Sequence, residues 1–236
     1  MEIRVLSSDD VQKALPMAEA IEGMKRAYSR LSSGRVEMPL RSRVHVPEQE
    51  GVLLAMPAAL PDDSEMAVKL VTVFGKNPAR GFPLIHAAVL VLDTENGQIK
   101  ALMDGEVLTA VRTGAGVGAA TELLASTDAV SVGIIGSGKQ ACSQLDAVCT
   151  VRSIRQAWVY SPNPEHVQNF VEKMSGVGPI PKDIQAVTSP AEAVKNADIV
   201  CTATTSSTPV ISFKTVSYTH LRAHETLRYR VWRLVV

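Results

Sequence analysis

The sequence predicts an α/β protein with a Rossmann-type doubly wound parallel sheet, incomplete, preceded by an α+β domain. The apolar run Ala129–Ile135 leads into the small-residue motif Gly136-x-Gly138-x-x-Ala141. Strand and helix patterns alternate after this motif, whereas the part before it is dominated by strand patterns. The predicted domain bounds are 1–118 and 119–215, and residues 216–236 form a separate tail.

The composition indicates a globular chain and excludes several classes of partner. The chain has 236 residues, of which 46% are hydrophobic and 20% charged, and 24 Lys and Arg balance 24 Asp and Glu. Zero net charge gives no electrostatic reason to expect nucleic acid. No 18-residue apolar run and no signal-peptide pattern occurs, so we expect no membrane partner and a cytoplasmic location. The three Cys lack CxxC spacing, which favours free thiols in a reducing compartment.

The first domain is predicted to contain two helical segments and a sheet. Residues 3–6 read as a strand, Ser7 or Ser8 as the N-cap of a helix, and the stretch from Pro16 to Gly34 as a second helix. Strands separated by Pro, Gly and acidic turn signals are then expected at 41–46, 51–60, 66–74, 85–93 and 97–105.

Two cations of this domain occur in apolar surroundings. Strand alternation places Lys69 on the same face as Ala67 and Val71, and a buried ammonium requires an anionic partner in the protein or in a ligand. An edge-strand Lys that reaches solvent is the alternative. Arg112 lies in a helix rich in Ala and Gly, whose backbone must approach a neighbour closely. Its guanidinium can bind a carboxylate or form an internal salt bridge.

The motif after Ala129–Ile135 predicts a dinucleotide site. Gly136 permits a tight turn, Gly138 lets the backbone approach a pyrophosphate, and Ala141 allows close packing of helix and strand. Further strands are expected at 156–160, 183–187 and 198–204, with helices between them. Right-handed crossovers then give the strand order 3-2-1-4, with the cofactor crevice between strands 1 and 4.

The second of these strands is followed by Ser161, Pro162 and Asn163, and no acid stands where one would bind the ribose 2′-OH of NAD. Ser161 and Asn163 could donate to a 2′-phosphate, but no Arg is present in the loop. Both NAD and NADP therefore stay open, with a slight preference for NADP. The hydroxyl-rich loop 202–207 is expected to line the nicotinamide side, unless it is an ordinary turn.

Residues 1 to about 215 resemble the ornithine cyclodeaminase/mu-crystallin family, in which a nicotinamide dinucleotide is the cofactor. The matching stretches are PLRSR (39–43), GVLLAMPA (51–58), VKLVTVFGKNPARGFP (68–83), DGEVLTAVRTGA (104–115), GIIGSGKQA (133–141) and TATTSSTPV (202–210). The resemblance implies that Arg41, Lys69 and Arg112 bind the substrate carboxylate, with Lys69 as the catalytic residue, and that Met56 lines the pocket. The cofactor-binding residues assigned with it are Thr113, Gly136, Ser137, Gly138, Lys139, Gln140, Ala141, Ser161, Thr202, Ala203 and Thr204.

Two departures from the family pattern narrow the expected function. Leu54 stands where ornithine cyclodeaminase has a Glu that binds the distal amine, which disfavours ornithine. The stretch in which the family carries its catalytic Asp is replaced here by residues 216–236, whose composition differs from the rest and whose run SYTHLRAHET resembles translated sequencing adapter. We therefore expect this tail to be non-native, the chain to be a fragment and the fragment to be inactive. No metal role is expected for His220 and His224.

The expected function of the parent protein is that of an NAD(P)-dependent amino-acid dehydrogenase or imine reductase. Its substrate is expected to be a small 2-amino or cyclic imino acid, and its assembly a homodimer formed through the first domain. Two alternatives remain: an ornithine cyclodeaminase that returns the hydride it borrows, and a non-catalytic ligand-binding protein like mu-crystallin.

Overall fold

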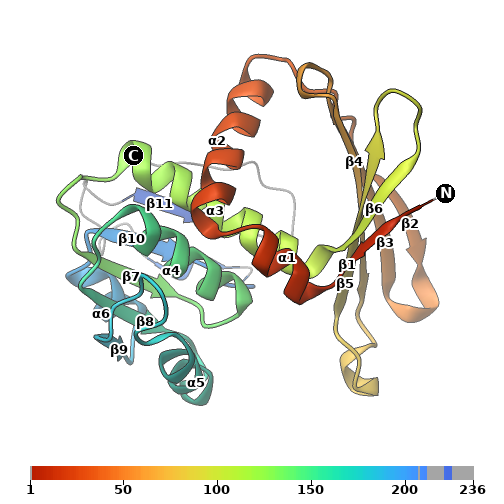
Figure 1. Ribbon diagram of the computed structural model, residues 1–236. Coiled ribbons are helices and arrows are strands. Elements are labelled where there is room, and N and C mark those ends of the chain that lie inside the picture. The colour runs from red at the N-terminus through yellow and green to blue at the C-terminus, as the bar shows by residue number, and fades with distance from the viewer. Residues whose placement is uncertain (1, 207, 212–220, 225–236) are drawn as a thin grey trace. The chain divides into compact units, whose positions relative to one another are not determined.

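The computed structural model describes residues 2–206, 208–211 and 221–224, with only the backbone for Asp63 and 221–224 (Figure 1). The chain divides into two compact units. Unit 1 comprises the described residues up to Pro16 and Lys25–Thr109, and unit 2 comprises Met17–Met24 and the described residues from Ala110 onward. The division falls within helix α3 (Gly105–Leu124), most of which the predicted bounds 1–118 and 119–215 assign to the first domain.

Unit 1 is built on a six-stranded sheet in the order β1-β6-β5-β4-β3-β2. The edge strand β1 runs parallel to β6, and the other neighbours are antiparallel. Each strand expected from alternation is present. Their bounds are Arg4–Leu6 (β1), Ser42–Val46 (β2), Gly51–Leu60 (β3), Glu65–Phe74 (β4), Ile85–Asp93 (β5) and Ile99–Asp104 (β6).

Short connections with recognisable local chemistry join these elements. Ser7 and Asp10 form a capping box at the start of α1 (Ser8–Ala14), which settles the N-cap on Ser7. Three 3₁₀ turns, Pro47–Gln49, Pro61–Asp63 and Pro78–Arg80, each begin with Pro. Helix α2 (Met17–Ser32) contributes its first half to unit 2 and its second half to unit 1.

Unit 2 is the predicted Rossmann-type sheet. Its strands are all parallel, and the order β9-β8-β7-β10 is the 3-2-1-4 order expected from the sequence. The backbone of β11, within the predicted tail, pairs with β10, while most of residues 216–236, His220 included, lies outside the described residues. The strand bounds are Ser131–Ile135 (β7), Gln156–Tyr160 (β8), Ile184–Ala186 (β9), Ile199–Thr202 (β10) and Leu221–His224 (β11).

Besides the first half of α2, the described part of unit 2 contains four helices wholly or in part, and small residues line the contact between two of them. The four are α3, α4 (Lys139–Val151), α5 (Pro164–Met174) and α6 (Pro190–Lys195). A Cβ on Gly114 would collide with the backbone of Ser143 in α4, and one on Gly118 would lie 3.2 Å from Ala147 Cβ. The close approach predicted for the Gly-rich helix is therefore its packing against α4.

Two apolar clusters form the core of unit 2, one centred on Ile134, Leu145 and Val159 and a smaller one around Ile135 and Val194. Within the described ranges, no helix is both long and apolar enough to cross a membrane. The described residues also contain no group of three or more His, Cys, Asp or Glu side chains suited to a metal ion.

Candidate active site

The turn after β7 has the backbone geometry that a dinucleotide pyrophosphate needs. Gly136 adopts φ +115°, its N–H donates to Tyr160 O at 2.7 Å, and a Cβ there would collide with Ala203 O. Ala203 N in turn donates to Ile135 O at 2.7 Å, so the ends of β7, β8 and β10 are joined around one glycine. Only Gly fits this position without strain.

Helix α4 begins directly after this turn with its N-terminus open. Gly138 is the N-cap residue and supplies no side-chain cap, and a Cβ built on it meets nothing within 4 Å. A helix N-terminus without a side-chain cap presents backbone N–H groups and the positive end of the helix dipole to an anion. The space beside Gly138 and the uncapped helix therefore fit a pyrophosphate.

The other residues assigned to the cofactor occupy different environments in unit 2. Ala141 is fully buried against the sheet, as the motif requires, whereas Ser137 is half-buried and Lys139 exposed. Gln140 Oε1 is buried and has no hydrogen-bond partner, so the side chain is directed inward.

The remaining cofactor assignments fall on β8, β10 and α3. Ser161 follows β8 and is half-buried, and Thr202 closes β10 in a buried position. Beyond it, Thr204 Oγ1 accepts from Ser206 N at 3.1 Å in the hydroxyl-rich loop, of which Ser207 lies outside the described residues. Thr113 is buried in α3.

In unit 1, two of the predicted substrate residues, Met56 and Lys69, fall on one row across the sheet. Met56 and Val89 stand directly opposite Lys69 on the two neighbouring strands. Arg41 directly precedes β2, whose first residue Ser42 pairs with Ala55, and Arg41 is exposed. Residues opposite one another on paired strands share a face of the sheet. Side chains from three separate stretches of sequence are thus brought together.

Lys69 is held by the start of α3. Its Nζ donates to Thr109 Oγ1 at 3.2 Å, and Thr109 Oγ1 donates to Gly105 O at 2.6 Å. The edge-strand alternative is wrong, since β4 pairs on both sides, and the side chain is half-buried. Sequence reasoning missed Thr109, although it lies three positions before Arg112 in the same predicted helix. Arg112 itself is half-buried and belongs to unit 2.

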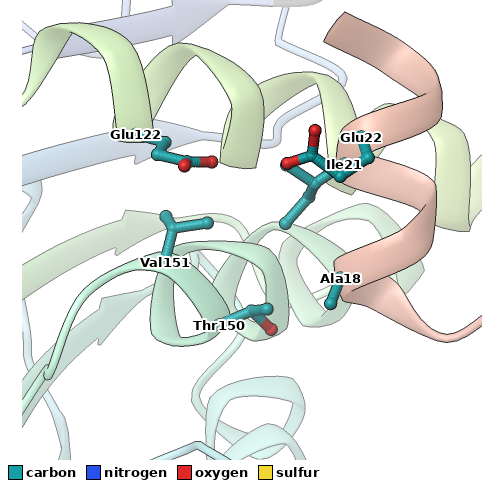
Figure 2. Close-up of a pocket in the computed structure, with 6 residues that line it drawn as sticks. All are labelled: Ala18, Ile21, Glu22, Glu122, Thr150 and Val151. Carbon is teal, nitrogen blue, oxygen red and sulfur yellow. The ribbon is translucent and has the colours of Figure 1, made fainter.

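A separate hollow in unit 2 lies away from the glycine turn. It has a volume of about 300 Å³, and Figure 2 shows the carboxylates of Glu22 and Glu122 beside it. Thr150 and Val151, at the C-terminal end of α4, also line it, whereas Gly138 is at the other end of that helix. Thirteen helical residues separate the two ends by about 20 Å. This hollow is therefore distinct from the candidate dinucleotide turn.

A parallel sheet in 3-2-1-4 order, with a glycine turn and an open helix N-terminus at the carboxyl end of its first strand, defines a Rossmann dinucleotide-binding unit. The chain belongs to the ornithine cyclodeaminase/mu-crystallin family, whose model matches residues 1–224. The family and the fold class expected from the sequence are both confirmed.

Individual relatives agree with this assignment. A Δ¹-pyrroline-2-carboxylate reductase of Bacillus cereus is 32% identical over 224 residues, which cover 95% of this chain and 68% of that protein. The solved structure of a Thermococcus litoralis Δ¹-pyrroline-2-carboxylate reductase, in complex with NADH and L-proline, is 38% identical with a TM-score of 0.85. The match covers 94% of this chain and 69% of that one.

An archaeal alanine dehydrogenase dimer with bound NAD is 30% identical, with a TM-score of 0.83, and the match covers 93% of this chain and 66% of that one. These relatives confirm the predicted class of function, an NAD(P)-dependent oxidoreductase of this family.

Proposed function

We propose that the protein transfers hydride to or from the Cα of a small 2-amino or 2-imino acid, with a cyclic imino acid of the pyrroline-2-carboxylate type as the substrate to test first. The observation that carries this proposal is the pair of Met56 and Lys69, opposite one another on one face of the unit 1 sheet, in a chain that also has a dinucleotide turn. A cation beside an apolar side chain suits a small molecule with one carboxylate and a hydrocarbon ring.

Each cation has a role in this proposal. Arg41 and Arg112 are proposed to bind the substrate carboxylate, and a guanidinium can do so through two parallel hydrogen bonds. Lys69 is proposed to bind the same carboxylate through its ammonium, which Thr109 positions. Fixing the carboxylate fixes the adjacent Cα, which is where the bond to hydrogen forms or breaks. Lys69 is thereby a catalytic residue through direct contact with the substrate, and Met56 packs against the ring.

The cofactor is proposed to lie on unit 2. Backbone N–H groups around Gly136, Ser137 and Gly138 and the start of α4 would hold the pyrophosphate, and the loop after β10 would line the nicotinamide. When bound, the nicotinamide supplies the hydride acceptor or donor. The further residues assigned to this site are Thr113, Lys139, Gln140, Ala141, Ser161, Thr202, Ala203 and Thr204.

Leu54 argues against ornithine cyclodeaminase as the activity. It lies two positions from Met56 on β3, so its side chain is on the same face of the sheet. An apolar side chain there offers no partner for the distal ammonium of ornithine. A substrate without a second amino group fits this face better.

An absorbance assay at 340 nm tests the proposed function. It uses pyrroline-2-carboxylate with reduced cofactor, and alanine or ornithine with oxidised cofactor. The assay is run on this chain and on a chimera in which residues 216–236 are replaced by the matching and following segment of the Thermococcus relative.

A reductase or dehydrogenase changes the absorbance, whereas a cyclodeaminase forms proline from ornithine without net change. We expect turnover of pyrroline-2-carboxylate by the chimera and none by the chain itself. Tight cofactor binding by the chimera with no turnover of any of these compounds would instead favour a ligand-binding protein and contradict the proposal.

We further propose that the protein is a homodimer formed through unit 1. The sheet face opposite Lys69 carries the row Pro57, Val68, Leu90 and Leu102, all of them apolar and only half-buried. Contiguous apolar surface of this kind is typical of protein–protein interfaces. A cytoplasmic location is proposed as well, supported by the three cysteines, which are all free thiols.

A further inference from the structure

The loop that follows β8 begins next to the glycine turn. Tyr160, the last residue of β8, accepts the hydrogen bond from Gly136 N at 2.7 Å. Ser161, Pro162 and Asn163 come directly after it, and α5 starts at Pro164. In Rossmann units the group at this place meets the 2′ position of the adenosine ribose. This loop therefore decides whether a 2′-hydroxyl or a 2′-phosphate is accepted.

A 2′-phosphate needs compensation for a charge of about −1.5 to −2 at neutral pH. The loop and the first turns of α5 provide none, because the sequence from Gln156 to Glu172 contains no Lys or Arg, and the cation of α5, Lys173, is in its last turn. The charged side chain nearest the loop along the sequence is Glu165, exposed in the first turn of α5, and His166 follows it. A carboxylate at this place repels a phosphate dianion.

The N-terminus of α5 is closed to an anion, in contrast with that of α4. Pro164 has no N–H, and Asn163 Oδ1 accepts from Glu165 N at 2.9 Å and His166 N at 3.4 Å. The next N–H, of Val167, bonds to Asn163 O at 3.3 Å. The amides of the first turn of α5 are thus already satisfied within the protein.

The same contacts change the role that the sequence suggested for Asn163. Its carboxamide is fixed in the helix cap, so Ser161 is the loop side chain that remains for the ribose. A hydroxyl can donate to and accept from a 2′-hydroxyl, but it carries no charge to balance a phosphate. We infer that the dinucleotide site selects NAD(H) and discriminates against NADP(H) through the closed loop Ser161–Glu165. This inference rests on the proposed function, because it assumes a dinucleotide at the Gly136 turn.

Lys139 is the cation that the glycine turn itself carries, at the first residue of α4. At that place it is adjacent to the proposed pyrophosphate, which both dinucleotides share. Removing its charge should therefore weaken NADH and NADPH alike. A selective loss of NADPH binding would instead assign the 2′-phosphate to Lys139.

Equilibrium fluorescence titrations with NADH and NADPH, without substrate, test the inference on the full chain. We expect the Kd for NADPH to exceed that for NADH by about tenfold or more, the scale of one missing charge-assisted contact. Pro162→Arg should lower the Kd for NADPH by about tenfold and leave the Kd for NADH within about twofold. Pro179→Arg, an identical change in the exposed loop after α5, is the matched control and should alter neither Kd. Circular dichroism verifies that each variant is folded.

The outcomes separate the inference from the function on which it rests. Equal or tighter binding of NADPH by the unmodified chain would overturn the inference and leave the dinucleotide site intact. A selective loss of NADPH binding in Lys139→Gln would also overturn the inference. Equal Kd values for NADPH in Pro162→Arg and Pro179→Arg would overturn it as well. Failure to bind either dinucleotide would overturn both the inference and the proposed function.

Discussion

At the scale of single residues, Arg152 closes the C-terminal end of α3. Its guanidinium donates to five backbone carbonyls, those of Thr121, Glu122, Ala125, Ser126 and Val151, at 2.8 to 3.0 Å. These include carbonyls of the last helical turn that have no partner within the helix. A cation here also opposes the negative end of the helix dipole. One side chain therefore ties the ends of α3 and α4 together.

Replacing this guanidinium by an ammonium should destabilise the protein. We expect Arg152→Lys to lower the free energy of unfolding by about 2 to 4 kcal/mol, because Lys cannot reach several carbonyls at once and leaves buried acceptors unsatisfied. Urea denaturation measures the change. The matched control is Arg155→Lys, three residues away with an exposed side chain, which should cost less than about 0.5 kcal/mol. Equal effects of the two substitutions would contradict the capping role.

The three thiols should differ in reactivity with their burial. Desolvation raises the pKa of Cys149 to about 12, with contributions from Asp146 and Cys201, and desolvation raises the pKa of Cys201 to about 12. Partial burial also raises the pKa of Cys142, which Lys173 partly offsets. Because the thiolate is the reactive form, we expect iodoacetamide at pH 8 to label Cys142 slowly and the other two only after unfolding. Peptide mass spectrometry measures the order in which the three thiols are labelled.

The same shifts have a defined sign for stability. A thiol whose pKa is raised in the folded state keeps its proton while the unfolded chain loses one. Cys149 and Cys201 therefore lower the free energy of unfolding as the pH rises from about 9 to about 12. Rapid labelling of Cys149 or Cys201 in the native protein at pH 8 would contradict the burial of that thiol.

At the scale of elements, two glycines of unit 2 have different roles, one in packing and the other in the proposed binding of the cofactor. Gly133, inside β7, faces α6 so closely that a Cβ would collide with Ala193 O. Gly138 starts α4 with an extended backbone and open space around it. The first glycine is needed for packing between a strand and a helix, and the second for access to the helix N-terminus.

We expect Gly133→Ala to be strongly destabilising and Gly138→Ala to fold normally but bind NADH at least about tenfold more weakly, because a methyl group would occupy the space proposed for the pyrophosphate. Thermal denaturation and NADH titration of both variants give the comparison. Unchanged NADH affinity in Gly138→Ala would place the cofactor elsewhere.

Much of this arrangement could be predicted from sequence because the signals are local. Apolar alternation gave the strands of unit 1, and apolar runs with small residues gave the strand order of unit 2. The parallel pairing of β1 with β6 could not be predicted, since no local pattern specifies a partner 97 residues away. Likewise, alternation placed Lys69 on its face of the sheet but could not identify Thr109, which reaches it from a different element.

Asn163, in the candidate site, is a second residue whose contacts could not be predicted from local sequence patterns. The sequence offers a polar side chain at the correct place for a cofactor contact, yet its oxygen is engaged by the amides of the following helix. Pro164 at the first helical position, after an Asn, was the available signal for a capped helix. The motif predicts where the site lies, whereas the use of each side chain depends on the local hydrogen bonds.

At the scale of the whole molecule, the apolar face opposite Lys69 should control assembly. We expect a mass of about twice the 25.3 kDa chain by light scattering, and a monomer for Val68→Lys, because a charge at the centre of a self-complementary apolar surface opposes pairing. Val177→Lys is the matched control on an exposed loop of unit 2 and should stay dimeric. A folded Val68→Lys variant that remains dimeric would exclude this face as the interface.

Because the loop before α5 is at the surface, the choice between NAD(H) and NADP(H) can change without a change in the core of the fold. Pro162 is exposed, takes no part in the cap that Asn163 forms, and belongs to neither apolar cluster of unit 2. A few surface substitutions could therefore redirect the protein from the catabolic to the biosynthetic pool of reducing equivalents, while its interior stays unchanged.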